Sequence, residues 1–261
     1  MDLALEGKCA IVTGGSEGLG RATVLALAAE GCDVAFCARR SDPLEEVAAE
    51  VRGAHGRRAV PVVADLRHLD EVDRFVSEAA AAFGRIDIVV NCAGASQFGT
   101  LFNIPDERWS EDITLKLIGY VRVARAAVPH MRGRSGHIVN VAGAGGKIPS
   151  SAHLTGGAAN AAVLNFTHAL AQQLGEEGIN VVAISPGHIR SPRFTVAVET
   201  RARESGQSHE EVERALTDAI PIRRAATLAE IAQVIAFFAS DRASCVTGSS
   251  VAVDGGLNPT I

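Results

Sequence analysis

The chain has 261 residues, 47% of them hydrophobic, with a formal net charge of -5 and a pI near 5.9. A chain of this length and composition can bury a large core. Its mild acidity gives no basic field for nucleic acid, and no apolar run approaches the roughly 18 residues of a membrane span. The first eight residues include Asp2 and Glu6 and lack a long apolar stretch, so we expect no secretory signal and a cytoplasmic protein.

The five cysteines include no Cys-x-x-Cys pair, and their odd number does not suit a disulfide framework. We therefore interpret all five as small buried residues of a protein from a reducing compartment, and we expect no metal site.

Short runs rich in Val and Ile alternate with longer segments of helical period. The expected strands are residues 9–13, 34–37, 59–63, 86–90, 137–141, 181–185 and 250–253. Each is almost continuously apolar, which is typical of parallel strands buried on both faces. Between them, residues 69–83 carry apolar side chains three and four positions apart, which suits a helix docked on a sheet. The pattern predicts stacked βαβ units, and so an α/β fold with about seven parallel strands.

No Pro-, Gly- or Ser-rich linker and no internal repeat divides the chain, so we expect one domain over residues 1–261. Its one long polar interruption, residues 190–218, lies between the last two expected strands. In an open α/β sheet, a segment there follows the carboxyl end of a strand, where ligands bind. We therefore expect residues 190–218 to form a lid over a substrate.

A glycine-rich turn, Thr13-Gly14-Gly15-Ser16-Glu17-Gly18-Leu19-Gly20, joins the first strand to a helix. Glycines at such a turn let backbone N–H groups approach a pyrophosphate, which then lies against the positive end of the helix. The spacing of Gly14, Gly18 and Gly20 is Thr-Gly-x-x-x-Gly-x-Gly and differs from the commoner dinucleotide fingerprint.

This spacing resembles that of the short-chain dehydrogenases/reductases, and further motifs of that family follow in order over essentially the whole chain. They are Asp65-Leu66 (the adenine-contacting pair), Asn91-Cys92-Ala93-Gly94 (the Asn-Asn-Ala-Gly block), Pro186-Gly187 (the nicotinamide-side turn) and Val253-Asp254-Gly255-Gly256 (the C-terminal signature). The resemblance implies a Rossmann-type doubly wound parallel sheet, a small-molecule substrate and a homo-oligomer, either a tetramer or a dimer. It also implies a nicotinamide dinucleotide bound by Gly14, Ser16, Glu17, Gly18, Leu19, Gly20, Arg39, Arg40, Asp65, Leu66, Asn91, Ala93, Gly94, Pro186, Gly187 and Ile189.

The end of the second strand bears on the choice between NAD and NADP. An NAD-specific site has an acidic residue there to accept hydrogen bonds from the ribose hydroxyls, whereas an arginine pairs with the 2′-phosphate of NADP. Ala38 is not acidic and is followed by Arg39 and Arg40, so we favour NADP(H) over NAD(H). Two solvated surface arginines are the alternative. Glu17 weighs against NADP, because many NADP-binding relatives carry a basic residue in that turn.

The family resembled here transfers a proton with a Tyr, assisted by a Lys four residues later, a Ser that orients the substrate and an Asn on an earlier helix. The present chain has no Tyr-x-x-x-Lys motif, since its one tyrosine, Tyr120, is followed four positions later by Ala124. Matching the motifs places Gly143 at the Ser position, Gly156 at the Tyr position, Asn160 at the Lys position and Lys116 at the Asn position. We therefore expect an atypical proton relay.

Lys116 and Asn160 look like a reciprocal exchange, because the two positions face each other in the family. One interpretation is that Lys116 returns a positive charge to the nicotinamide ribose while Asn160 hydrogen-bonds the ribose or Lys116. The other is that Lys116 points to solvent. The candidates for a replacement acid are His153, three residues before the vacant Tyr position, and His188, directly after Pro186-Gly187. Tyr120 is interpreted as a packing residue.

Three functions are compatible with these residues. The first is an NADP(H)-dependent oxidoreductase acting on a carbonyl or alcohol, the second a non-redox lyase or isomerase in which Lys116 polarises a carbonyl, and the third a catalytically silent NADP(H)-binding sensor. Fold alone does not decide among them. The complete set of cofactor motifs and the charged segment at residues 190–218, which contains Arg193, Arg201 and Arg203, favour the oxidoreductase.

Overall fold

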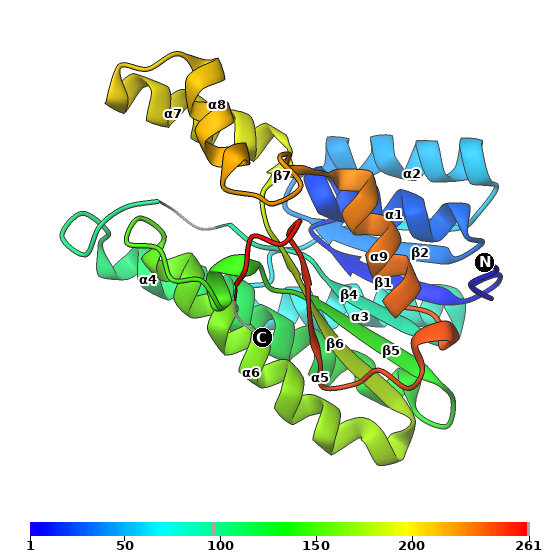
Figure 1. Ribbon diagram of the computed structural model, residues 1–261. Helices are drawn as coiled ribbons and strands as arrows, with labels where there is room; N and C mark the ends of the chain where they lie inside the picture. The colour runs from blue at the N-terminus through cyan, green and yellow to red at the C-terminus, as the bar shows by residue number, and fades with distance from the viewer. Residues whose placement is uncertain (96–97, 260–261) are drawn as a thin grey trace.

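A central parallel sheet organises the computed structural model, which describes residues 1–95 and 98–259 (Figure 1). Its strand order is β3-β2-β1-β4-β5-β6-β9. The strands are β1 (Cys9–Thr13), β2 (Asp33–Ala38), β3 (Ala59–Val63), β4 (Ile88–Asn91), β5 (Gly136–Val141), β6 (Ile179–Pro186) and β9 (Ser250–Val253). The prediction of one doubly wound α/β domain with seven parallel strands is confirmed.

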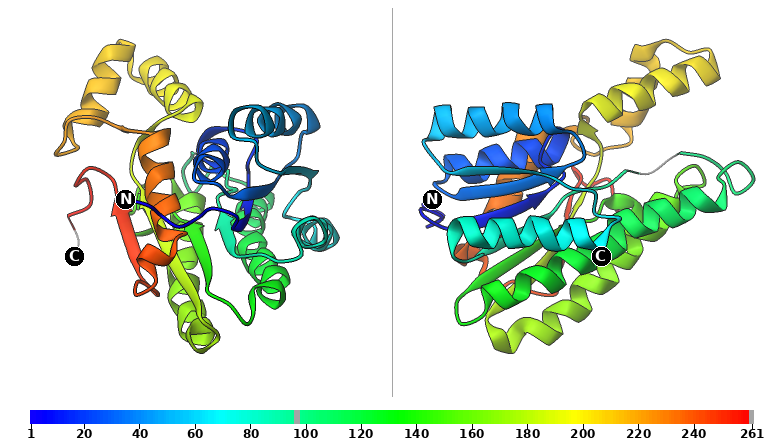
Figure 2. Two further views of the ribbon diagram at one scale, coloured as in Figure 1. Left: turned by 90° about the vertical axis from the view of Figure 1, so that its right-hand side faces the viewer. Right: turned by 180° about the vertical axis from the view of Figure 1, so that it is seen from behind.

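Helices cover both faces of the sheet, as the two views in Figure 2 show. One face carries α1 (Gly18–Ala29), α2 (Ser41–His55) and α9 (Leu228–Phe238), and the other carries α3 (Leu69–Phe83), α5 (Gly119–Met131) and α6 (Leu154–Leu174). Because side chains alternate along a strand, Ile11 and Val12 pack into the two opposite cores. The apolar stripe predicted for residues 69–83 is confirmed, since Val72, Phe75 and Val76 are buried in α3.

Two expectations about burial are wrong. The edge strand β9 is only partly buried, because a single neighbouring strand and fewer helices cover it. The cysteines are also not uniformly buried. Cys245 is exposed and Cys92 is half-buried, whereas Cys9, Cys32 and Cys37 lie in the core as expected.

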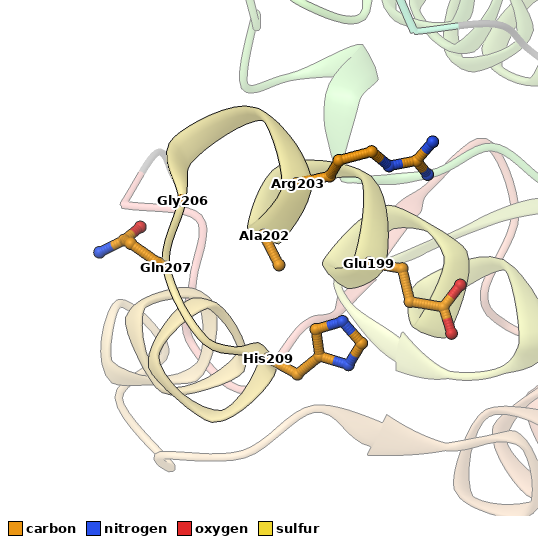
Figure 3. A pocket seen from close by; sticks show the side chains of 6 residues that line it. All are labelled: Glu199, Ala202, Arg203, Gly206, Gln207 and His209. Atoms are coloured by element: carbon orange, nitrogen blue, oxygen red, sulfur yellow. The ribbon is translucent and has the colours of Figure 1, made fainter.

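Residues 190–218, expected to be a lid, form a helical hairpin of α7 (Pro192–Ser205) and α8 (His209–Asp218) that projects beyond the sheet (Figure 1). A two-stranded ladder of β7 (Ile189–Arg190) and β8 (Ala226–Thr227) closes its base. An open hollow between the two helices is lined by Glu199, Ala202, Arg203, Gly206, Gln207 and His209 (Figure 3). None of these side chains reaches the cleft above the sheet, so the hollow is a feature of the hairpin alone.

Within residues 1–95 and 98–259, no helix combines the length and the apolar character that crossing a membrane requires.

A charged cluster lies at the start of β5. The ring of His137 is 3% exposed, and its Nε2 lies 3.0 Å from Oδ1 of Asp241. Asp241 also accepts hydrogen bonds from Ser135 Oγ at 2.7 Å and from Lys8 Nζ at 3.2 Å. Burial lowers the pKa of His137 below its ordinary value, although Asp241 opposes the shift. The folded protein therefore favours the neutral imidazole.

This lowered pKa predicts a loss of stability in mild acid. The contribution of His137 is complete above the pKa of a histidine in the unfolded chain, about 6.5, and is lost as the pH falls from there towards the lower folded-state pKa. We expect His137→Gln, whose amide can still donate to Asp241, to flatten the pH dependence of the free energy of unfolding between about pH 7 and 5. Urea unfolding at several pH values measures it. The exposed His130→Gln is the control, and an unchanged slope in His137→Gln would contradict the assignment.

Candidate active site

A cleft of about 450 Å³ opens at the carboxyl edge of the sheet, where β1 lies between β2 and β4. In a doubly wound sheet this is the place where the chain turns away to both sides and leaves a crevice. Most of the predicted cofactor residues line it, namely Gly14, Ser16, Glu17, Gly18, Leu19, Gly20, Arg39, Arg40, Asp65, Leu66, Ala93, Gly94 and Ile189. The structure therefore brings the separate motifs together around one cavity.

The glycine turn is shaped by two close contacts. Gly14 has φ 71°, and a Cβ on Gly20 would lie only 2.0 Å from the carbonyl oxygen of Gly14. The Oγ1 of Thr13 accepts hydrogen bonds from the N–H groups of Cys92, at 3.0 Å, and Ala93, at 3.1 Å. Thr13 thus ties the turn to the end of β4, a positioning role that the motif alone does not reveal.

Three predicted cofactor residues lie behind the cleft and do not line it. Asn91 is fully buried, and its Nδ2 donates to Oδ1 of Asn140 at 2.9 Å, which joins β4 to β5. Pro186 is buried at the end of β6. Gly187 packs so closely on Asp254 that a Cβ would lie 2.8 Å from the Asp254 Cβ. Asn91 and Pro186 thus end β4 and β6, and the predicted contacts of all three with a cofactor stay predictions.

Charged residues surround the end of the cleft near β2. Arg40 Nη2 lies 3.1 Å from Oε2 of Glu17, and both side chains are exposed. Arg39 also lines this end. The Asp65 carboxylate is bound by Arg67 at 2.6 Å, and this hydrogen bond holds the pKa of Asp65 below its ordinary value. Both acids of this region, Glu17 and Asp65, are therefore paired with an arginine, and Arg39 lines the same end of the cleft.

Lys116 is partly buried, and its amine points into the protein. Helix α4 (Asp106–Ile113) leads into α5 through a π-helical turn, Thr114–Ile118, which carries Lys116. Such turns occur frequently at functional sites. The Nζ of Lys116 donates to the carbonyl oxygen of Ala142 at 2.5 Å and lies 3.6 Å from where a Gly94 Cβ would be. Burial, with a smaller effect from nearby Arg193, lowers the pKa of Lys116 to about 8. The solvent-facing interpretation is therefore wrong.

Asn160 and His153 face the turn that follows β5. A Cβ on Gly143, where φ is 128°, would lie 3.0 Å from Asn160 Nδ2. A Cβ on Gly145 would lie 3.3 Å from His153 Nδ1 and 3.5 Å from Asn160 Nδ2. Asn160 is 5% exposed, and its Oδ1 has no hydrogen-bond partner among the residues that the structure describes. The hydrogen bond between Lys116 and Asn160, one of the predicted alternatives, is thus absent from the described part of the chain.

The structure separates His188 and Tyr120 from this group. The ring of His188 faces Phe194 of α7, with 5.8 Å between the ring centroids, and does not line the cleft. Tyr120 is fully buried, and its hydroxyl lies 3.0 Å from the carbonyl oxygen of Ala93 and 3.1 Å from that of Val141. The interpretation of Tyr120 as a packing residue is confirmed.

Two side chains that sequence reasoning missed stand beside His153. The Phe98 ring packs against the His153 ring in a tilted arrangement, with centroids 5.0 Å apart, and the guanidinium of Arg193 lies 5.7 Å from the Phe98 centroid. The Oδ2 of Asp112 accepts a hydrogen bond from Thr155 Oγ1 at 2.6 Å. No local pattern marks Phe98 or Asp112, because their neighbours come from distant parts of the chain.

Comparison with known proteins agrees with this geometry. A family model described as enoyl-(acyl carrier protein) reductase matches residues 14–258. The 3-oxoacyl-(acyl-carrier-protein) reductase FabG of Thermotoga maritima is 34% identical over 256 residues, which are 98% of this chain and 99% of that protein. The chain belongs to the short-chain dehydrogenase/reductase superfamily. By family it is a short-chain oxidoreductase.

Solved structures of other short-chain dehydrogenases superpose closely. The L-sorbose reductase of Gluconobacter frateurii, in complex with NADPH and L-sorbose, has a TM-score of 0.95 and 32% identity over 100% of both chains. A xylitol dehydrogenase with bound NAD+ has a TM-score of 0.92 and 29% identity, over 97% of this chain and 100% of that one. The neighbours of this short-chain dehydrogenase thus include proteins bound to either dinucleotide.

The position of Tyr120 predicts a structural role that can be measured. We expect Tyr120→Phe to lower the free energy of unfolding by about 1–3 kcal/mol, because two buried carbonyls lose their shared donor. NADPH affinity should stay unchanged. Denaturant unfolding and fluorescence titration measure the two effects, with Thr200→Val, which removes an exposed hydroxyl on α7, as the control. Unchanged stability together with loss of turnover would instead place Tyr120 in the chemistry.

Proposed function

We propose that the protein is an NADP(H)-dependent oxidoreductase that interconverts a carbonyl and an alcohol, with Lys116 as the proton donor. The observation that carries this proposal is the partly buried Lys116 ammonium group, which binds the Ala142 carbonyl and lies next to Gly94 of the cleft wall. The comparisons support it, because several similar proteins are named reductases and one was solved with NADPH.

The described residues fit a nicotinamide dinucleotide. The glycine turn leaves open space beside Gly18, which is the first residue of α1. The N-terminus of a helix favours a bound phosphate. Within residues 1–95 and 98–259 the Oδ1 of Asn160 has no hydrogen-bond partner, so it is a buried acceptor suited to a ribose hydroxyl. Arg39 and Arg40 would hold a 2′-phosphate. When bound, this cofactor would supply the hydride for reduction or accept it in oxidation.

Reduction of a carbonyl leaves negative charge on its oxygen, so a nearby proton donor is required. The Lys116 ammonium has three N–H bonds, and Ala142 occupies one of them. Another can therefore be donated to the substrate oxygen, after which Lys116 is a neutral amine and regains a proton from solvent. In oxidation the neutral amine accepts the alcohol proton. Gly143 and Gly156 have no hydroxyl to take this part.

His153 is the proposed second member of the relay. Burial lowers its pKa, as do Arg193 and Lys116, so the ring favours its neutral form beside two cations. A neutral imidazole can pass protons between solvent and Lys116. His188 has no place in this scheme, because its ring packs against Phe194 of α7. We propose that the α7–α8 hairpin acts as a lid, since Arg193 of α7 lines the cleft.

Lys116→Met tests the proton donor. We expect the mutation to lower kcat for carbonyl reduction by about 10²- to 10⁴-fold, because the acid is lost. In the unmutated protein, kcat for reduction should fall as the pH rises through about 8, where the ammonium loses its proton, and kcat for oxidation should rise there. Stopped-flow oxidation of bound NADPH over a panel of ketones, quinones and β-keto thioesters identifies a substrate for the assay.

Lys147→Met is the matched control, because it removes a lysine from the turn after β5 and leaves the hydrogen bond between Lys116 and Ala142 in place. Unchanged turnover in Lys116→Met would overturn the proposed role of the lysine. Tight NADPH binding without oxidation by any carbonyl would favour the sensor or the non-redox enzyme.

Cofactor choice should depend on the arginines after β2. We expect Arg39→Ser combined with Arg40→Ser to weaken NADPH binding by about 10- to 100-fold, because charge-assisted bonds to a phosphate are lost. The affinity for NADH should not change.

Glu17→Gln should strengthen NADPH binding, since it releases Arg40 from its ion pair. Fluorescence titration measures these affinities, with Arg74→Ser on α3 as the control. An equal loss for both dinucleotides would contradict NADP selectivity.

A further inference from the structure

A buried hydrogen bond joins α4 to α6, two helices that contact each other (Figure 1). The Oγ1 of Thr155 donates to Oδ2 of Asp112 at 2.6 Å. Thr155 is fully buried and Asp112 is 2% exposed, so water does not compete for this bond. Asp112 is the last residue but one of α4, and Thr155 is the second residue of α6. The bond therefore fixes the end of one helix against the beginning of the other.

The surroundings of the Asp112 carboxylate favour a negative charge. Its Oδ1 lies 3.3 Å from Nε of Arg108, one helical turn earlier in α4. The N-terminus of a helix also stabilises an anion, and the first turn of α6, which contains Thr155, has no acidic residue of its own. These contacts offset the cost of burying a carboxylate.

The two members of the proposed relay lie close to this bond along the chain. Lys116 is four residues after Asp112, on the π-helical turn that continues α4 without a break. His153 is the N-cap of α6, two residues before Thr155. A shift of α4 along α6 would therefore move Lys116 relative to His153.

The π-helical turn is anchored on its other side as well. Tyr120 is four residues after Lys116, and its hydroxyl lies 3.0 Å from the carbonyl oxygen of Ala93 and 3.1 Å from that of Val141. The turn that carries Lys116 is thus held at both ends. This matters because a displacement by one residue would rotate its side chains by about 100° about the helix axis.

We propose that Asp112 and Thr155 are positioning residues, whose hydrogen bond sets the place of Lys116 beside His153 and so the efficiency of proton transfer. This inference rests on the proposed function and adds two residues to its site. A hydrogen bond between buried groups suits the task, because it is satisfied in one arrangement, whereas apolar side chains can pack in several.

Thr155→Val tests the bond, because it removes the hydroxyl and keeps the shape of the side chain. We expect kcat for carbonyl reduction to fall about 10- to 100-fold, the scale of a displaced catalytic group. The affinity for NADPH and the KM of the substrate should stay unchanged. Thr155→Ser keeps the hydroxyl and should retain most of the activity.

A second measurement reports the position of Lys116 without any substrate. The lysines of the chain are Lys8, Lys116 and Lys147, so peptide mass spectrometry can follow the acetylation of each by acetic anhydride, which reacts with the neutral amine. In the unmutated protein the rate at Lys116 should rise through a midpoint near its lowered pKa of about 8. In Thr155→Val we expect this midpoint to move up, because the displaced amine meets more water. Cys92 and Arg193, which also act on the pKa of Lys116, are the same in both proteins.

Thr167→Val is the matched control. Thr167 lies on the same helix and is 1% exposed, and its hydroxyl accepts from Asn140 Nδ2 at 2.9 Å and donates to the carbonyl oxygen of Val163 at 2.8 Å. Both variants should lower the free energy of unfolding, measured in urea, because each loses a buried hydroxyl. Only Thr155→Val should change kcat and the midpoint at Lys116.

Asp112→Asn separates the hydrogen bond from the charge, because its amide oxygen can still accept from Thr155. We expect the midpoint at Lys116 to stay near that of the unmutated protein. A shift as large as in Thr155→Val would overturn the proposal, since the charge and not the bond would then hold Lys116.

The remaining outcomes also decide the matter. An unchanged midpoint in Thr155→Val overturns the proposal, as does an equal shift in Thr167→Val. A shifted midpoint with unchanged kcat overturns it too, provided that Lys116→Met lowers kcat. If Lys116→Met does not lower kcat, the proposed function fails, and the midpoint alone then shows whether the bond positions the lysine.

Discussion

The site depends on one topological constraint, the position of β1 between β2 and β4 in a parallel sheet. The chain leaves the carboxyl ends of these strands in opposite directions, so no helix can cover the point between them. Thr13 holds this point together, because its hydroxyl oxygen binds two N–H groups at the end of β4. The cleft, the glycine turn and the approach of Lys116 to Gly94 all follow from this arrangement.

Much of the fold was predictable, because short sequence patterns indicate its strands and helices. Buried parallel strands are apolar runs, and a docked helix repeats its apolar residues every three or four positions, as α3 does from Leu69 to Phe83. The edge strand β9 is an exception, because its residues are mostly apolar but neighbouring elements bury it only in part. The sequence of a strand shows whether its side chains are apolar enough to be buried. How much of them stays exposed depends on the strands and helices that pack beside the strand.

The cofactor side of the site was more predictable than the chemical side. Residues of the glycine turn and of the strand ends belong to short contiguous motifs, and most of them line the cleft. By contrast, the neighbours of Arg193 come from the loop before α4 and the loop before α6. No spacing rule links such residues. Lys116 lies on a π-helical turn, and no sequence pattern predicts such a turn. The direction of its side chain was therefore left open by the sequence.

The glycines after β5 have a consequence for how this protein can change. Position 143 has φ 128°, where L side chains rarely lie, and a Cβ there would be 3.0 Å from Asn160 Nδ2. A serine introduced at this one position would strain the backbone and crowd Asn160 at the same time. A hydroxyl side chain at position 143 therefore requires compensating changes around it, and the single substitution is disfavoured.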